Sequence, residues 1–377
     1  MKIFIAANAF HNFGGGDVIF SELGKRWSRL GAKVTIATNQ KGKEFCLHRG
    51  ISIHQIIVWG TSVFDSYSVV VSLLIKTFNS VVNALKIDYS GYDAIFSMSD
   101  YWPDIFPAVI AKIKNPHIKW IAACYLIHPA PSLIQKGRTK KCIAWIVQQL
   151  SLRLVSRYAD AVWTASQEDT KEFYNNKQLT RKSVLAIRGG IDLHLSASAS
   201  KQLKRYDAVF VGRFHEQKCI DELLDIWKEV VEVIPKARLG LIGGGLQEKY
   251  LRTKAATAGL NANVSFLGVM DGAKKVAVLK SSRMFISASR HDSGNIALDE
   301  VLACGILGII YDLPKMDYPK GVIKISVGDS SAFRDSIVRL LQSKSERARL
   351  GKEGFAFIKQ FDWNVKARQT LTFIRSL

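Results

Sequence analysis

Cysteine is scarce in this chain and shows none of the spacings that bind metal. The 377 residues include five cysteines, with no Cys-x-x-Cys pair and no Cys/His ligand spacing among them. This distribution argues against a structural zinc site and favours reduced thiols in a cytosolic setting. The five are Cys46, Cys124, Cys142, Cys219 and Cys304.

Long apolar runs are also missing. A transmembrane helix needs about 20 apolar residues, whereas the longest helical apolar stretch, Val69–Ile75, is broken by Lys76. The opening residues Met1 and Lys2 lead directly into Ile3–Ala7, which is too short for the apolar region of a signal peptide. We therefore expect a cytoplasmic protein with no membrane span.

Acidic residues are few relative to basic ones. There are 32 Asp and Glu against 53 Lys and Arg, a net charge of +21. Such a surface attracts polyanions, which include nucleic acid, anionic lipid and phosphorylated substrates. No basic stripe interleaved with aromatics and no known nucleic-acid module is present, so we expect no nucleic-acid partner.

What the chain does contain is the pattern of two successive α/β units. Apolar strands alternate with helical stretches from residue 3, and the same plan restarts after a polar stretch, Ser196–Lys204, that is typical of a linker. We predict domains at residues 1–198 and 199–360, with a C-terminal helix over 361–377. The expected strands are Ile3–Ala7, Val34–Thr38, Ala94–Ser97, Trp120–Tyr125, Ala161–Thr164, Ala208–Val211, Arg238–Ile242, Val264–Leu267, Met284–Ser287 and Leu307–Tyr311.

Glycine-rich loops follow the first strand of one unit and the second strand of the other. Gly14–Gly16 precede a helix, and Gly243–Gly245 follow a strand. Glycine lets backbone approach a ligand at a helix N-terminus. No Gly-Lys-Ser/Thr follows Gly14–Gly16, and no acidic residue ends the second strand, so neither a Walker loop nor a dinucleotide site is indicated. The alternative is a structural tight turn.

Two cations and two carboxylates follow strands of the second unit. Arg213 and Lys218 lie on one loop, where both could reach a diphosphate. Asp292 and Glu300 flank the start of a helix, where carboxylates accept hydrogen bonds from sugar hydroxyls. A solvated basic loop and ordinary helix caps are the alternatives.

His128 and a basic segment complete the candidate features of the first unit. His128 lies just past an apolar strand and could contact a sugar hydroxyl or support catalysis, although a lone His is more often structural. Lys136, Arg138, Lys140 and Lys141 precede apolar helical residues, and Val63–Leu85 adds an apolar helix. These segments fit peripheral contact with an anionic membrane, and equally core helices with a solvated basic rim.

Taken in order along nearly the whole chain, these segments resemble the retaining glycosyltransferases of family 4, which have the GT-B fold. The match includes the glycine loop at Gly14–Gly16, the carboxylate segment from Asp292 to Glu300 and the following helix to Gly305. Further matching segments are Ala159–Ser166, Gly189–Asp192, Val211–Arg213 with Glu216–Lys218, Leu241–Gly245, Val264–Gly268 and Phe361–Trp363. The resemblance implies two Rossmann-like parallel-sheet domains facing across a deep cleft, with a C-terminal helix crossing back to the first domain.

The resemblance also implies roles for individual residues. Arg213 and Lys218 would neutralise the leaving nucleoside diphosphate, Asp292 would hold the donor sugar, and His128 would contact the sugar from the other domain. Glu300 would accept hydrogen bonds from the ribose. Backbone at Gly15, Gly16, Gly243, Gly244, Gly294 and Asn295 would complete the donor site. No Asp-x-Asp motif is present, so neither a metal nor another cofactor is expected.

The expected function is a retaining, metal-independent hexosyl transfer from a UDP- or GDP-sugar. The acceptor would be a hydroxyl of a glycan or a lipid-linked molecule in cell-surface polysaccharide, lipopolysaccharide or glycolipid synthesis. Several positions depart from the family pattern. Asp292 to Asn295 replace a Glu-Gly-Phe-Gly element, Cys219 replaces a Gly and Leu307 replaces a Pro. The altered Asp292–Asn295 element leaves open the alternative of a catalytically weakened nucleotide-binding protein with a partner or regulatory role.

Overall fold

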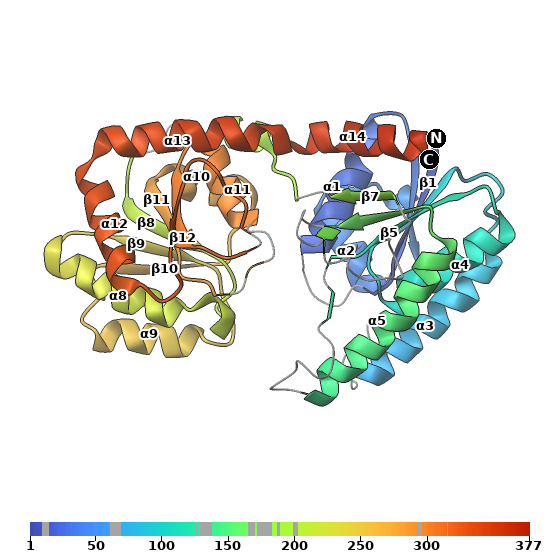
Figure 1. Ribbon diagram of the computed structural model, residues 1–377, viewed down its shortest axis with the longest axis horizontal. Helices are drawn as coiled ribbons and strands as arrows, with labels where there is room; N and C mark the ends of the chain where they lie inside the picture. The colour runs from blue at the N-terminus through green and yellow to red at the C-terminus, as the bar shows by residue number, and fades with distance from the viewer. Residues whose placement is uncertain are drawn as a thin grey trace. The chain divides into compact units, whose positions relative to one another are not determined.

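The computed structural model divides the chain into two compact α/β units (Figure 1). The first comprises Met1–Gly189 with Trp363–Leu377, and the second comprises Gly190–Asp362. The structure describes residues 1–9, 15–60, 69–125, 127–128, 138–164, 170–171, 183–186, 189–198, 203–290, 292, 296–314 and 316–377.

The first unit is built on a seven-stranded parallel sheet with the order β3-β2-β1-β4-β5-β6-β7. Its strands are β1 (Lys2–Ala7), β2 (Lys33–Thr38), β3 (Ile56–Val58), β4 (Ala94–Ser97), β5 (Lys119–Ala123), β6 (Ala161–Thr164) and β7 (Ser183–Ala186). Its helices are α1 (Gly15–Arg29), α2 (Gln40–His48), α3 (Val69–Lys86), α4 (Trp102–Lys114), α5 (Arg138–Tyr158) and α14 (Trp363–Ser376), with a 3-10 turn η1 at Ile53–Gln55.

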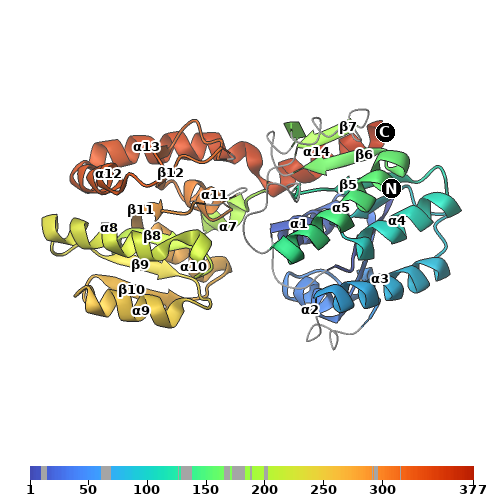
Figure 2. The same cartoon turned by 60° about the horizontal axis from the view of Figure 1, so that its bottom comes forward.

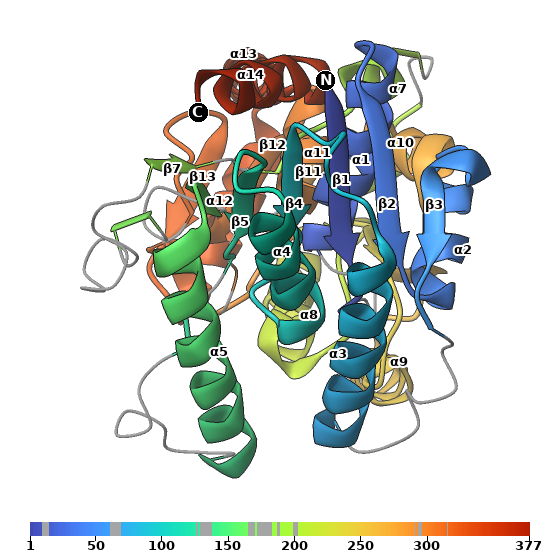
Figure 3. The same ribbon diagram turned by 90° about the vertical axis from the view of Figure 1, so that its right-hand side faces the viewer.

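Alternating side chains of β1 show how the two faces of this sheet are buried. Ile3 and Ile5 point to the face covered by α1, α2 and α14, whereas Phe4 and Ala6 point to the face covered by α3, α4 and α5. Both sets are fully buried, as expected for a parallel sheet with helices on both faces. Figure 3 shows α3, α4 and α5 lying in front of the sheet.

The C-terminal helix α14 belongs to the first unit. It packs on α1, where the indole N–H of Trp27 donates a hydrogen bond of 2.9 Å to the hydroxyl of Thr370. Trp363, Ala367, Leu371 and Ile374 of α14 are buried in the same cluster as the sheet. This agrees with the predicted return of the last helix to the first domain.

The second unit has a six-stranded parallel sheet of order β10-β9-β8-β11-β12-β13, most of which can be followed upward in Figure 2. Its strands are β8 (Tyr206–Val211), β9 (Leu239–Ile242), β10 (Val264–Gly268), β11 (Ser282–Ser287), β12 (Leu307–Tyr311) and β13 (Val322–Ile325). Its helices are α7 (Leu193–Ser198), α8 (Ile220–Val233), α9 (Glu248–Thr257), α10 (Gly272–Lys280), α11 (Ile296–Ala303), α12 (Ser330–Gln342) and α13 (Lys344–Ile358), with 3-10 turns η4 (Glu216–Lys218) and η5 (Lys359–Phe361).

Helices again cover both faces of the second sheet. On one face α8, α9 and α12 share a buried cluster with Phe210 and Ile286. On the other face α10, α11 and α13 share a cluster with Val209 and Phe285.

The prediction of a linker from Ser196 is wrong at its start. Residues up to Ser198 form helix α7, which packs on α10 and α11. Ser196 is buried, so the polar composition of this segment indicated a linker where the chain forms a packed helix instead.

Candidate functional site

Strand order locates the candidate site in each unit. The order reverses between β1 and β4 in the first sheet and between β8 and β11 in the second. Ligands of open parallel sheets bind outside the carboxyl ends of the strands at such a reversal. We therefore expect ligand-binding residues on the loops that follow β8 and β11 in the second unit, and on those that follow β1 and β4 in the first.

In the second unit, an ion pair joins the two loops at this reversal. Lys218 lies in η4 after β8, and Asp292 follows β11. The Nζ atom of Lys218 lies 2.7 Å from Oδ2 of Asp292, and the two side chains are 22% and 11% exposed. The fold thus brings two predicted site residues, 74 positions apart in the chain, into direct contact.

Arg213, the second predicted cation, lies on the same loop but makes no comparable contact. Its side chain is exposed, and no hydrogen bond or ion pair joins it to another described residue. Arg213 therefore presents its full charge to solvent at the carboxyl end of β8. Its predicted contact with a diphosphate stays a prediction.

The residue after Lys218 has a backbone conformation that is unusual for its type. Cys219 has φ 45° and ψ 45°, the only positive φ of a non-glycine residue in the described chain. Left-handed backbone costs an L-residue roughly 1–2 kcal/mol, which explains why glycine suits this position. Such strain is often found at functional sites, and here it lies next to the Lys218–Asp292 pair.

Gly243 is fixed by contact between two loops. It has φ 146°, and a Cβ built on it would lie 1.9 Å from the carbonyl oxygen of Gly212. Gly212 N donates to Ile242 O at 3.0 Å and Phe214 N donates to Gly244 O at 2.9 Å, which joins the loops after β8 and β9. The glycines at 243 and 244 therefore shape the loop that carries Arg213, whatever contact they make with a donor.

Glu300, the predicted ribose ligand, lies on α11 and pairs with a lysine that the sequence did not single out. Its Oε1 lies 2.7 Å from Nζ of Lys275 on α10. Burial raises the pKa of Glu300, while the Lys275 charge lowers it. The preceding Asp299 accepts a hydrogen bond from the hydroxyl of Tyr318 instead, so Glu300 and Asp299 serve different partners.

In the first unit, His128 is held by a buried glutamine. The backbone N–H of His128 donates a hydrogen bond of 2.8 Å to Oε1 of Gln148 on α5. Nε2 of Gln148 in turn donates a hydrogen bond to Oδ2 of Asp100, which follows β4. Burial raises the pKa of Asp100, whereas Gln148 and His128 lower it. Gln148 thus links the loops that follow β4 and β5, and sequence reasoning missed it because nothing distinguishes it from the neighbouring Gln149.

Asp104 joins the end of β1 to the start of α4. Its Oδ1 accepts from the backbone N–H groups of Asn8 and Ala9, at 2.5 and 3.0 Å, and its Oδ2 accepts from the hydroxyl of Ser99 at 2.6 Å. Burial raises the pKa of Asp104 to about 7, and these hydrogen bonds act in the opposite direction. Asp104 lies in the first turn of α4, but its backbone partners are about 95 positions away in the chain, so its sequence position alone does not reveal this contact.

The predicted glycine loop of the first unit is described only in part. Gly15 begins α1, and a Cβ on Gly16 would lie 2.9 Å from the ring of Tyr125. Gly14, Gly294 and Asn295 lie outside the described residues. Among the residues that are described, no group of three or more His, Cys, Asp or Glu side chains could hold a metal ion.

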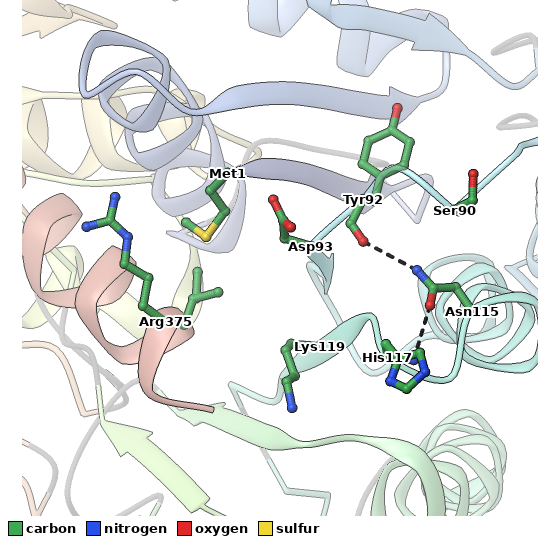
Figure 4. A pocket seen from close by; sticks show the side chains of 9 residues that line it. Met1, Ser90, Tyr92, Asp93, Asn115, His117, Lys119 and Arg375 are labelled. Atoms are coloured by element: carbon green, nitrogen blue, oxygen red, sulfur yellow. Dashed lines mark hydrogen bonds between the residues drawn. The ribbon is translucent and has the colours of Figure 1, made fainter.

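A hollow of about 670 Å³ lies at the amino ends of strands in the first sheet, opposite to their carboxyl ends (Figure 4). Asp93 and Lys119, which border it, stand at the amino ends of β4 and β5, and Arg375 reaches it from α14. Asn115 is already engaged with the carbonyl of Tyr92. Because ligands of parallel sheets bind at the carboxyl ends, this hollow is separate from the candidate site.

The same described residues contain no helix that is long and apolar enough to cross a membrane.

Residues 194–357, most of the second unit, match the family model of glycosyl transferases group 1. The phosphatidyl-myo-inositol mannosyltransferase of Mycobacterium leprae is 30% identical over 199 residues, 49% of this chain and 51% of that protein. The chain thus spans about half the length of the first curated relatives it matches. An uncharacterized glycosyltransferase of Methanocaldococcus jannaschii is 22% identical over 345 residues, 87% of this chain and 86% of the relative.

Solved structures confirm the fold over the full length. The pneumococcal O-GlcNAc transferase GtfA, in complex with UDP and GlcNAc, has a TM-score of 0.77 at 10% identity and is covered to 99%, with 100% of this chain. Anabaena HepE, in complex with UDP and glucose, has a TM-score of 0.73 at 15% identity, with both chains covered to 100%. The chain therefore has two Rossmann-like parallel-sheet domains of the GT-B type, as predicted.

Proposed function

We propose that this protein is a glycosyltransferase that moves a hexosyl unit from a UDP- or GDP-sugar to a hydroxyl of a glycan or lipid-linked acceptor. One observation carries the proposal. Lys218 and Asp292 meet at the strand-order reversal of the second unit, within the stretch that matches glycosyl transferases group 1. The matched mannosyltransferase and the UDP-bound structural neighbours support the same chemistry.

The proposed reaction retains the configuration at the anomeric carbon. The bond from that carbon to the diphosphate oxygen breaks, the acceptor oxygen bonds to the carbon from the same face, and the departing diphosphate takes the hydroxyl proton. Arg213 and Lys218 stabilise the negative charge that develops on the diphosphate, which is the task that a divalent metal performs in other transferases.

The remaining predicted residues bind and orient the donor. Glu300 accepts hydrogen bonds from the ribose, and Asp292 accepts them from hydroxyls of the sugar. His128 keeps its predicted role as a contact of the sugar. Cell-surface polysaccharide, lipopolysaccharide or glycolipid synthesis is the proposed setting of the reaction.

Thermal unfolding with UDP, GDP, ADP, CMP and their sugar conjugates tests the donor site. A nucleotide at about 100 times its dissociation constant adds roughly 2.7 kcal/mol of stability. We expect this shift with UDP or GDP, and its loss in a protein carrying both Arg213→Ala and Lys218→Ala. A shift without any sugar transfer would favour the catalytically weakened binding protein, the alternative left open by Asp292 in place of the family's Glu. No shift with any nucleotide would contradict both.

We also propose that the acceptor is reached at an anionic membrane, through the outer side of α3. Val71, Leu74, Phe78 and Leu85 recur at helical spacing, and Leu74 and Phe78 are 52% and 68% exposed. The sequences of α3 and α5 contain no acidic residue, so no negative charge on these two helices opposes an anionic surface. This combination of apolar stripe and positive charge is the observation that favours a membrane over a soluble acceptor.

Replacing Phe78 by Ser is expected to lower the binding of the protein to anionic liposomes at least roughly tenfold, because an inserted Phe contributes about 1.5–3 kcal/mol. Val233→Ser, at an exposed apolar position in the second unit, is the matched control and should bind as the native chain does. Pelleting with anionic and with neutral liposomes measures the effect. Equal pelleting of the native protein with both kinds would contradict the proposed membrane contact.

A further inference from the structure

Helices α10 and α11 hold a lysine and a glutamate in contact on one face of the second sheet. Nζ of Lys275 on α10 lies 2.7 Å from Oε1 of Glu300 on α11 and 3.5 Å from Oδ1 of Asp271, the N-cap of α10. Leu279 from α10 and Val301 from α11 belong to one fully buried cluster. The two charged side chains therefore stand on helices whose apolar sides are fixed by packing.

Only one of two adjacent lysines takes part. Lys275 is 13% exposed in its side chain, whereas Lys274 is exposed and makes no ion pair with a described residue. An ammonium group has three N–H donors, and a carboxylate has two oxygens that both accept. Lys275 occupies Oε1 of Glu300, and no described residue donates to Oε2.

We propose that Lys275 is a positioning residue of the donor site, which fixes the carboxylate of Glu300 through this ion pair so that Oε2 accepts a hydrogen bond from a ribose hydroxyl of the nucleotide. The inference rests on the proposed function, because it takes Glu300 as a donor ligand. It adds a residue that determines how well that ligand works. Lys275 itself makes no bond to the reacting atoms.

The surroundings of Glu300 show why a cation is needed there. Burial raises the pKa of Glu300, the negative charges of Asp271 and Asp299 act in the same direction, and Lys275 alone lowers it. Cys304, directly after the end of α11, has its pKa raised to about 11, so it stays neutral. Lys275 is thus the one named group that opposes protonation of this carboxylate.

Two other helices, α13 and α7, pack on α11, and no residue of either is among the named causes that lower the pKa of Glu300. Helix α13 approaches through Gly354, on which a Cβ would lie 2.7 Å from Leu302. Helix α7 carries His194, which is exposed. Without Lys275, Glu300 would take up its proton at a higher pH than in the native chain, and a protonated carboxyl is a poorer acceptor for a hydroxyl.

The test measures the dissociation constant of UDP or GDP, whichever binds the native protein, over a series of pH values. Lys275→Met should weaken binding by roughly tenfold to a hundredfold, the range for losing a hydrogen bond to a charged group. The loss should grow as the pH falls, because Glu300 is then protonated. Lys275→Arg should restore binding, and Lys274→Met, the matched control on the same helix, should leave both the affinity and its pH dependence unchanged.

The Glu300→Gln variant tests the role of Glu300 as a donor ligand separately from the role of Lys275. Weak, pH-independent binding by Glu300→Gln together with native behaviour of Lys275→Met would overturn the role of Lys275 while keeping Glu300 as a donor ligand. Native binding by Glu300→Gln would instead overturn the assignment of Glu300 in the proposed function. A normal unfolding transition of Lys275→Met, measured alongside, excludes loss of the fold as the cause of weaker binding.

Discussion

Replacing Arg213 by alanine is expected to lower the rate of glycosyl transfer by about a hundredfold to a thousandfold, the usual effect of removing one group that stabilises charge in a transition state. Arg213 is exposed and holds no described residue in place, so the fold should not suffer. The loss should fall on kcat, since the negative charge on the diphosphate grows as the sugar leaves. Steady-state kinetics with the donor identified by thermal unfolding measures it.

Arg238→Ala provides the control for this experiment. Arg238 is also exposed and lies in the same unit. It directly precedes β9 and so stands at the amino end of that strand, away from the carboxyl ends where ligands bind. Its removal changes the net charge equally and should leave the rate unchanged. If Arg213→Ala and Arg238→Ala behave alike, the cation that stabilises the diphosphate is not Arg213, and the assignment of this loop is wrong.

Gly243→Ala is expected to destabilise the second unit by more than about 1–3 kcal/mol, the cost of strained backbone alone. The methyl group would also meet the carbonyl oxygen of Gly212, 1.9 Å from the ideal Cβ position, so one of the two loops must move. Because Arg213 follows Gly212, we expect weaker nucleotide binding as well. Urea unfolding, followed with and without nucleotide to identify the transition of the second unit, measures the loss.

Gly259→Ala separates strain from collision. Gly259 also has a positive φ, 75°, but a Cβ there would meet nothing within 4 Å. It should cost only the backbone term of roughly 1–2 kcal/mol. Equal losses at positions 243 and 259 would show that the loops after β8 and β9 are not held as close together as the structure places them.

The sequence predicted the central strands of both sheets because each is a short apolar run between turn residues. Strand β1 is one example, with five consecutive buried positions from Ile3 to Ala7. The strands that were missed are β3, β7 and β13, which lie at sheet edges. They are apolar in composition but only three or four residues long, and their burial patterns are partial, so each is too short to give a clear periodic signal. Tertiary pairing, rather than local pattern, makes them strands.

In the candidate site too, some residues could be predicted from the sequence and others could not. Arg213, Lys218, Asp292 and Glu300 were found because they stand in ordered segments that resemble a known family. The contact between Lys218 and Asp292 was not predicted and is seen only in the structure. Lys275 could not be predicted, since Gly272–Lys280 contains several lysines and only the packing of α10 decides which one turns inward. Gln148 and Asp104 were missed for a similar reason, because their partners are distant in sequence.

The Lys218–Asp292 contact has a consequence for how the site treats simple anions. With the carboxylate 2.7 Å from the ammonium group, the lysine already holds an attached anion. A tethered group acts at an effective concentration of the order of millimolar or above, so free phosphate or chloride must compete with Asp292 and gains little by doing so. By the proposed function, a nucleoside diphosphate sugar would bring further contacts, to Arg213 and Glu300, and its sugar hydroxyls would give Asp292 a new partner. We therefore expect the Lys218–Asp292 pair to disfavour small anions and to open for a ligand that offers partners to both of its members together.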